Sequence, residues 1–239
     1  MMVQFNEILR FIQIYIVQLS VGGILFILMA ILILKRSTKK LNQIVAMFFI
    51  SIASSTIVNV TYAPLRISAF VEFLNILAYF LFNWAMVCLL LLNLLILRST
   101  KLINFKIQIA IIVIWTIILI GLFPIGLLDG VRIDETTNWR PVWNLPFLLY
   151  GLGTGFFCMA IPTIYYSIKV YNNLEVEKLE KRWRLFIAGM VFYYIIWAGI
   201  SIVNFVAIEI VRTIWGGILL FSFSAIYILY YGIAKQLQE

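Results

Sequence analysis

Histidine is absent from this sequence of 239 residues, and cysteine occurs only twice. Without histidine, the chain lacks the ligands of bis-histidine haem and of histidine-bound zinc or copper. It also lacks the base of Ser-His-Asp and Cys-His catalytic groups. Both cysteines, Cys88 and Cys158, fall inside long apolar runs. This position excludes an extracellular disulfide between them and favours a role as small apolar packing residues.

Charged residues are also scarce. They make up 12% of the chain, whereas 64% of the residues are hydrophobic and the mean hydropathy is +1.06. Soluble domains have about 25% charged residues. A soluble fold of this length leaves roughly 30% of the surface of its unfolded chain in water, so it has no place for this much apolar surface. The composition therefore requires lipid as the solvent.

Seven apolar stretches are long enough to cross about 30 Å of hydrocarbon as helices of roughly 20 residues. They cover residues 11–34, 41–63, 71–97, 107–128, 146–171, 185–207 and 211–231. We therefore expect an all-α fold, a single seven-helix transmembrane bundle over residues 1–239. The first stretch is too long for a cleavable signal peptide, and no small-residue cleavage site follows it.

The basic residues predict the orientation, because short cytoplasmic loops carry an excess of lysine and arginine. Thirteen of the eighteen basic residues lie on one side: Lys35, Arg36, Lys39, Lys40, Arg98, Lys101, Lys106, Lys169, Lys178, Lys181, Arg182, Arg184 and Lys235. The other side has Arg10, Arg66, Arg132, Arg140 and Arg212. We expect a multi-pass protein of the cell membrane, with its N-terminus outside and its C-terminus in the cytoplasm.

The net charge of +8 does not indicate a nucleic-acid partner, because the charges form short clusters beside the predicted spans. Such clusters face the anionic lipids of the cytoplasmic leaflet. The expected partner is therefore the lipid bilayer, and no nucleic acid is expected.

No ionisable residue falls near the midpoint of a predicted span. Arg66, Glu72, Glu209 and Arg212 lie at the outer boundaries, where long side chains reach water. Ion-coupled pumps and intramembrane proteases need charged groups inside the bilayer. We therefore do not expect an enzyme, and we expect no metal or other cofactor.

The length and topology resemble those of microbial rhodopsins, and the third span contains Asn83-Trp84 followed by a leucine run and Asn93. That resemblance implies a retinal Schiff base on a lysine of the seventh span. No lysine lies between Arg212 and Lys235, so retinal is not expected.

Uncharged polar side chains recur at helical spacing in three spans. They are Thr56, Asn59 and Tyr62 on the second span, Asn75, Tyr79 and Asn83 on the third, and Trp197, Ser201 and Asn204 on the sixth. Because amide and hydroxyl groups in hydrocarbon need partners, these stripes are expected to face the bundle interior. Two interpretations are open: the residues hold the helices together, or they line an outward-opening pocket for an unknown ligand.

The fifth span contains residues that shape helices. Gly151, Gly153 and Gly155 are expected to allow close helix approach, because they lie inside the span and not in a phosphate-binding loop. Pro162 is expected to kink this helix.

Two connecting segments have distinctive patterns. The outer loop, residues 129–144, contains Trp139 and Trp143, which we interpret as part of an interfacial aromatic belt. The inner segment, residues 172–184, predicts a helical extension with i,i+3 and i,i+4 charge pairs. Its basic side chains are candidates for cytoplasmic coupling: Lys178, Lys181, Arg182 and Arg184.

The first span is followed by the basic loop Lys35-Arg36-Ser37-Thr38-Lys39-Lys40 and by a second span rich in Ser and Phe. This order resembles the seven-helix sensor module of microbial histidine kinases. The charged residues 177–184, running into residues 185–190, are similar to the connection between its fifth and sixth helices. The resemblance covers the whole chain in outline and implies a sensor. No transmitter domain follows the seventh helix, so a separate cytoplasmic signalling partner is expected.

These patterns favour a receptor or sensor-like protein that relays an outer-pocket or bilayer signal to the cytoplasm. One alternative is a facilitative transporter of a small neutral solute, with a topology like that of the SWEET transporters. Its route through the inner half would use Asn42, Gln43, Asn93 and Gln108. A further alternative is a structural subunit whose polar stripes face a neighbouring membrane subunit.

Overall fold

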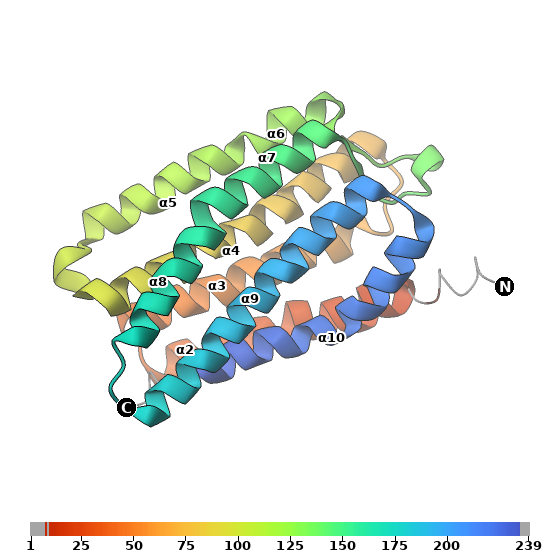
Figure 1. Ribbon diagram of the computed structural model, residues 1–239. Coiled ribbons are helices and arrows are strands. Elements are labelled where there is room, and N and C mark those ends of the chain that lie inside the picture. The colour runs from red at the N-terminus through yellow and green to blue at the C-terminus, as the bar shows by residue number, and fades with distance from the viewer. Residues whose placement is uncertain (1–7, 9, 235–239) are drawn as a thin grey trace.

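In the computed structural model, the described residues form seven helical rods that run side by side in one bundle (Figure 1). The structure describes residue 8 and residues 10–234, without the side chains of residues 99–101, 220–226 and 232–234. The expected all-α fold is confirmed. Helices suit these apolar stretches because a helix satisfies its own backbone hydrogen bonds in hydrocarbon. Lys235, one of the basic residues used above, lies outside the described residues.

The rods follow one another along the chain, and several combine α-helical with wider π-helical turns. They are η1 (Ile12–Leu25) with α2 (Phe26–Arg36); α3 (Lys40–Tyr62); α4 (Ser68–Leu102); α5 (Phe105–Ile120) with α6 (Leu122–Ile125) and η2 (Gly126–Gly130); α7 (Leu145–Gly155) with η4 (Phe156–Ala160) and α8 (Ile161–Asn172); α9 (Glu177–Val206); and α10 (Glu209–Ala234).

Six helices, counted over the described residues, are long and apolar enough to cross a membrane, which indicates a membrane protein. They are Ile12–Arg36, Lys40–Tyr62, Ser68–Arg98, Phe105–Gly130, Leu145–Asn172 and Glu177–Val206. Each matches a predicted span to within a few residues, except that α9 begins at Glu177, eight residues before residue 185. The seventh predicted span, 211–231, falls on α10. Because the side chains of residues 220–226 are not described, that span stays a prediction.

The two ends of the bundle differ in structure and charge. At one end, β1 (Val131–Arg132) and β2 (Val142–Trp143) pair antiparallel around the short helix η3 (Glu135–Thr137). We call this the hairpin end; the strands were not predicted from the sequence. The opposite end holds the loops that are rich in lysine and arginine, and we call it the basic end.

Local sequence signals explain where several helices begin and end. The side chains of Asn104 and Asn144 cap α5 and α7 by accepting backbone N–H groups three residues ahead, each over 3.0 Å. Helix α9 ends at Val206, and the left-handed backbone of the next residue, Ala207 (φ 56°), turns the chain. Only Ala207 and Ile208 separate α9 from α10.

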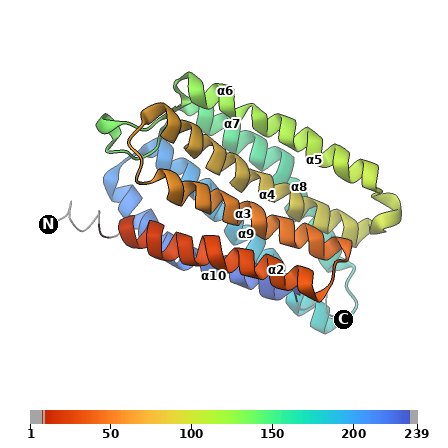
Figure 2. The same ribbon diagram turned by 180° about the vertical axis from the view of Figure 1, so that it is seen from behind.

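Helix α4 lies at the centre of the bundle and α5 at its edge. In the most apolar stretch of α4, 67% of the residues are buried. In the most apolar stretch of the rod that contains α5, 22% are buried. Both views show α5 along one edge and α10 with α2 along the opposite edge (Figures 1 and 2). The side of α5 that faces away from the bundle is covered by exposed isoleucines such as Ile114 and Ile117, as expected of a lipid-facing helix.

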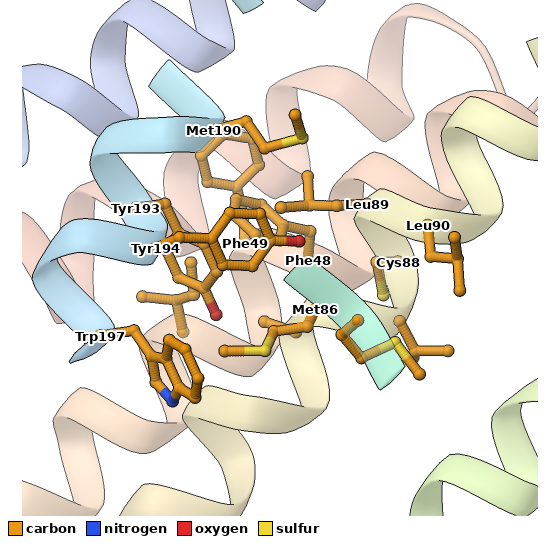
Figure 3. Packing of buried hydrophobic residues seen from close by; sticks show 14 of the residues in the cluster. Phe48, Phe49, Met86, Cys88, Leu89, Leu90, Met190, Tyr193, Tyr194 and Trp197 are labelled. Carbon is orange, nitrogen blue, oxygen red and sulfur yellow. The ribbon is translucent and has the colours of Figure 1, made fainter. Parts of the chain in front are cut away.

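Tightly packed aromatic and sulfur-containing side chains fill the middle of the bundle (Figure 3). Tyr193 on α9 lies edge-on to Phe48 on α3 with ring centroids 5.4 Å apart, and Phe48 meets Phe49 in the same way. All three side chains are at most 1% exposed. Cys88 is buried in this core, as its predicted packing role requires, whereas Cys158 is exposed on the bundle surface.

Two of the three glycines on α7 allow close helix approach, as predicted. A Cβ at Gly151 would lie 2.8 Å from the Tyr79 ring, and one at Gly155 would lie 2.4 Å from the Trp197 ring. Gly153 has open space around it. The turns just before Pro162 are π-helical, because proline provides no backbone N–H for the regular helical pattern.

Candidate functional site

A cavity of about 300 Å³ lies at the hairpin end, between η1, α3, α4, α9 and α10. The segment that leads into β2 also contributes to its wall. The cavity is at the lower end of the size range of small-molecule sites, about 300–1,000 Å³. It is the candidate site because most of the sequence-predicted pocket residues meet there.

Six of the nine polar residues predicted to line a pocket do line this cavity: Thr56, Asn59, Tyr62, Asn75, Tyr79 and Asn204. Several also connect helices. Asn59 donates to the side-chain oxygen of Gln18 on η1 over 2.6 Å, and Asn75 donates to the Tyr62 hydroxyl over 2.8 Å. The same side chains therefore act in both ways that the sequence left open, as interhelical contacts and as a polar wall.

The other three, Asn83, Trp197 and Ser201, are buried beside the cavity and do not line it. The side-chain oxygen of Asn83 accepts the Trp197 indole N–H over 2.9 Å, and Ser201 lies 3.0 Å from the Tyr79 hydroxyl. Asn83 also donates to the backbone oxygen of Tyr79 over 2.8 Å. We call these four residues the polar network; it joins α4 to α9. For Asn83, Trp197 and Ser201 the structure favours the first of the two interpretations, interhelical contact, because their polar groups satisfy one another.

The floor of the cavity is apolar. Ile52, Phe82 and Ile196 are the lining residues of α3, α4 and α9 that lie farthest from the hairpin end. One helical turn farther along α3 and α9 lie Phe48 and Tyr193, and the Phe82 ring lies 5.1 Å from the Tyr193 ring. The aromatic core of Figure 3 therefore begins directly below the floor.

Three arginines on the cavity wall were missed by the prediction: Arg10, Arg140 and Arg212. Arg212, interpreted above as reaching toward water at a span boundary, is half-buried and donates to the backbone oxygen of Pro141 over 2.5 Å. Arg212 thus lies at the end of its helix, as its boundary position predicted, but the sequence did not predict its contact with the hairpin segment. One signal was present in the sequence, because all three belong to the few basic residues on the side predicted to lie outside.

Trp143 is also part of the site, and its assignment to an interfacial belt was wrong. It is 3% exposed and donates its indole N–H to the side-chain oxygen of Asn75 over 3.2 Å. Its ring lies edge-on to Tyr79 at 4.7 Å. The hairpin therefore packs into the bundle. Trp139 is half-buried, and the Arg66 guanidinium lies over its ring at 5.2 Å.

Glu72 holds this hairpin in place. Its carboxylate accepts the backbone N–H of Ile133 and the Ser68 hydroxyl, each over 3.0 Å. In the turn itself, the Thr136 hydroxyl and the Thr137 N–H donate to the Asp134 carboxylate over 2.6 and 3.1 Å. These hydrogen bonds, led by that from Thr136, lower the pKa of Asp134.

The predicted coupling residues lie at the basic end, away from the cavity: Lys178, Lys181, Arg182 and Arg184, all in the first turns of α9. The expected i,i+4 pairs are present, with Lys181 2.7 Å from Glu177 and Arg184 3.7 Å from Glu180. Trp183, between them, is buried and donates to the backbone oxygen of Ser167 on α8 over 2.8 Å.

Comparisons of the chain with protein-family models, with curated proteins and with solved structures found no match. Over the part of the chain that the structure describes, no group of three or more Cys, Asp or Glu side chains comes together in a way that could hold a metal ion. The geometry of the cavity is therefore the basis for the function proposed next.

Proposed function

We propose that this chain is a multi-pass membrane receptor or sensor-like protein that crosses the cell membrane seven times. It binds a ligand in the cavity at the hairpin end, and the ligand changes the basic end, where a cytoplasmic partner docks. The hairpin end lies outside and the basic end in the cytoplasm, since the lysine-rich loops follow the positive-inside rule.

One observation carries the proposal: the described side chains of α3, α4 and α9 close the cavity at its floor. Below Ile52, Phe82 and Ile196, the bundle is filled by fully buried side chains such as Phe48 and Tyr193. A closed cavity suits a protein that holds its ligand and does not pass it through the membrane. The described lining also offers no carboxylate or thiol that would serve as a base or nucleophile.

The amides of the inner half do not favour a transport route. Each donates its side-chain N–H to a nearby backbone oxygen: Asn42 to Ser37, Gln43 to Thr38, Asn93 to Leu89 and Gln108 to Ile103. Side chains used in this way stabilise loops and helix turns, and none of them lines the cavity. The structural-subunit alternative also loses support, because the polar stripes face the interior of this chain.

The long helix α9 gives a physical route between the two ends. It runs without interruption from Glu177 to Val206, with Asn204 in the cavity wall and Lys181 at the basic end. A ligand that prefers one packing of α9 against its neighbours shifts the population toward that packing. The π-helical turns before Pro162 provide a partner rod that can bend where its hydrogen-bond pattern is irregular.

A covalent cavity filler tests the relay without a known ligand. In a Cys88→Ala, Cys158→Ser background, Asn59→Cys is modified with a bulky methanethiosulfonate reagent, and backbone hydrogen exchange is measured over residues 172–184. We expect exchange in this segment to change. The matched control is Thr61→Cys, an exposed position at the end of α3 that does not line the cavity. Unchanged exchange at residues 172–184, or solute uptake by proteoliposomes of the unmodified protein, contradicts the receptor proposal.

The orientation has its own test in the same background. A membrane-impermeant maleimide should label Asn138→Cys, an exposed hairpin position, in intact cells. It should label Ser37→Cys, in the loop between α2 and α3, only after lysis. The reverse pattern contradicts the proposed orientation.

A further inference from the structure

Positive charge is concentrated at the mouth of the cavity. Arg10, Arg140 and Arg212 come from three separate parts of the chain and line the same wall. Arg10 and Arg140 both lie close enough to Arg212 to repel it electrostatically, whereas the nearby Glu209 attracts it. Arg140 forms an ion pair with Glu209, which is half-exposed and does not belong to the lining. The lining that the structure describes thus has three guanidinium groups and no carboxylate.

Such a gathering of like charges is unfavourable by itself. Between partly buried charges the repulsion is stronger than in water, because the surroundings are less polarisable and salt screens them less. The arrangement is therefore suited to a bound anion, whose charge offsets the repulsion. Guanidinium groups are the donors best matched to carboxylate and phosphate, since their planar N–H groups form paired hydrogen bonds with two oxygens.

Hydrogen bonds to backbone oxygens hold two of these guanidinium groups beside the cavity. The Arg212 guanidinium has five N–H donors, and one of them binds the Pro141 oxygen. That contact fixes the side chain against the hairpin segment, beside the cavity. Arg10 is held in the same way, by donating to the backbone oxygen of Trp139 over 3.0 Å. The hairpin thus positions two arginines from different helices around one opening.

Below the arginines, the wall changes from charged to polar to apolar. By their order along the helices, Asn59 and Asn204 lie nearer the hairpin end, whereas Ile52, Ile196 and Leu219 lie farther from it. A ligand that matches this gradient has an anionic group at one end and an apolar body at the other. The volume of about 300 Å³ limits that body to a small molecule.

We propose that the cavity binds a small organic anion, a carboxylate or phosphate on a short apolar body, with its anionic group between Arg10, Arg140 and Arg212. This inference names the ligand class of the proposed receptor and rests on that function only in taking the cavity as the ligand site. The anion comes either from solution or from the headgroup of an anionic lipid at the same face of the membrane.

Three probes with the same apolar chain test the proposal: hexanoate, hexyl phosphate and the neutral hexan-1-ol. Their binding to the purified protein in phosphatidylcholine nanodiscs is followed by tryptophan fluorescence, since Trp143 and Trp215 line the cavity. We expect at least one anion to bind about tenfold or more tightly than hexan-1-ol, the effect expected of a charge-assisted hydrogen bond. Equal affinity for the alcohol and both anions overturns the proposal, and this comparison needs no variant.

Matched variants locate the anion. Arg212→Gln should reduce the preference for the anion about tenfold, and Arg212→Lys should retain part of it because the charge remains. Arg132→Gln is the control: Arg132 lies on the same hairpin, its side chain is 63% exposed and it does not line the cavity. If Arg212→Gln retains the full preference, or if Arg132→Gln reduces it equally, the anion is not bound at the cavity mouth and the proposal fails.

The two sources of the anion are separated by changing the lipid. Nanodiscs that contain phosphatidylglycerol supply a competing phosphate headgroup. Weaker hexanoate binding in these discs, abolished by Arg212→Gln, supports a lipid phosphate as the occupant. Unchanged binding supports an anion from solution. These measurements do not involve residues 172–184, so failure of the anion proposal is distinguishable from failure of the relay.

Discussion

Trp197 on α9 donates its indole N–H to the side-chain oxygen of Asn83 on α4 over 2.9 Å, and neither side chain is more than 1% exposed. The backbone oxygen of Asn83 accepts a second indole N–H, from Trp115 on α5, over 3.2 Å. One asparagine thus connects three helices next to the cavity. In hydrocarbon, the alternative to such contacts is an unsatisfied polar group.

Replacing Asn83 should destabilise the protein through this contact. We expect Asn83→Leu to lower the free energy of unfolding by about 1–3 kcal/mol, because it leaves the Trp197 N–H buried without its acceptor. The double variant with Trp197→Phe should lose less than the sum of the two single variants, with a coupling of about 0.6 kcal/mol or more. Unfolding in mild detergent measures the cycle. Strict additivity would show that the contact contributes nothing.

Close packing of α9 against α10 depends on a glycine. A Cβ at Gly189 would lie 2.7 Å from the backbone nitrogen of Leu229, which cannot move without displacing α10. We expect Gly189→Ala to cost about 1–3 kcal/mol of stability. Gly153→Ala is the control, because nothing lies within 4 Å of its Cβ position. It should be neutral or stabilising by up to about 1 kcal/mol through helix propensity. Thermal unfolding should rank the two variants clearly; equal melting temperatures would contradict this account.

The hairpin should loosen when Asn75 is replaced. Asn75→Leu removes the acceptor of the Trp143 indole and the donor to the Tyr62 hydroxyl, both buried groups. Hydrogen exchange at residues 131 and 143, which pair in the two short strands, should become faster. Glu135→Gln, at an exposed position in the same hairpin, should leave exchange unchanged. Normal protection of the strands in Asn75→Leu would show that Trp143 is held by apolar packing alone.

The turn of the hairpin should respond to acid but not to mild changes of pH. The pKa of Asp134 is lowered below its ordinary value of 3.8, chiefly by the hydrogen bond from Thr136. A carboxyl whose pKa is lower in the folded state stabilises that state above the unfolded value, and this contribution is lost as the pH falls through the folded value. Protection of the Thr137 amide, corrected for intrinsic exchange, should stay constant from neutral pH until the pH falls below 3.8. Asp134→Asn, which cannot titrate, should remove the acid-dependent step; a step that persists would belong to another group.

Much of the fold follows from the sequence alone. The apolar stretches predicted the helices, and the glutamate and lysine spacing at residues 172–184 predicted the helical extension that begins at Glu177. The short strands of the hairpin escaped prediction because they have two residues each, which is too few for a periodic pattern. Their position depends instead on tertiary contacts, such as that between Glu72 and Ile133.

The candidate site could be predicted only in part. Polar side chains at helical spacing, such as Asn59 and Asn75, stood out because their surroundings are apolar. The pattern did not distinguish them from Asn83, because one helical turn separates a side chain on the cavity wall from one inside the packed interface. Arg140 was unpredictable as a wall residue, since it reaches the cavity from a loop whose path the sequence does not specify.

The two-residue turn at Ala207 limits how the cavity can open. Because the connection is short and Gly189 packs closely against Leu229, α9 and α10 are expected to move as one unit. Helix α9 then cannot move away from the cavity without α10. A larger occupant would therefore require other parts of the wall to move, among them the wide turns of η1, which carry Ile14 and Gln18.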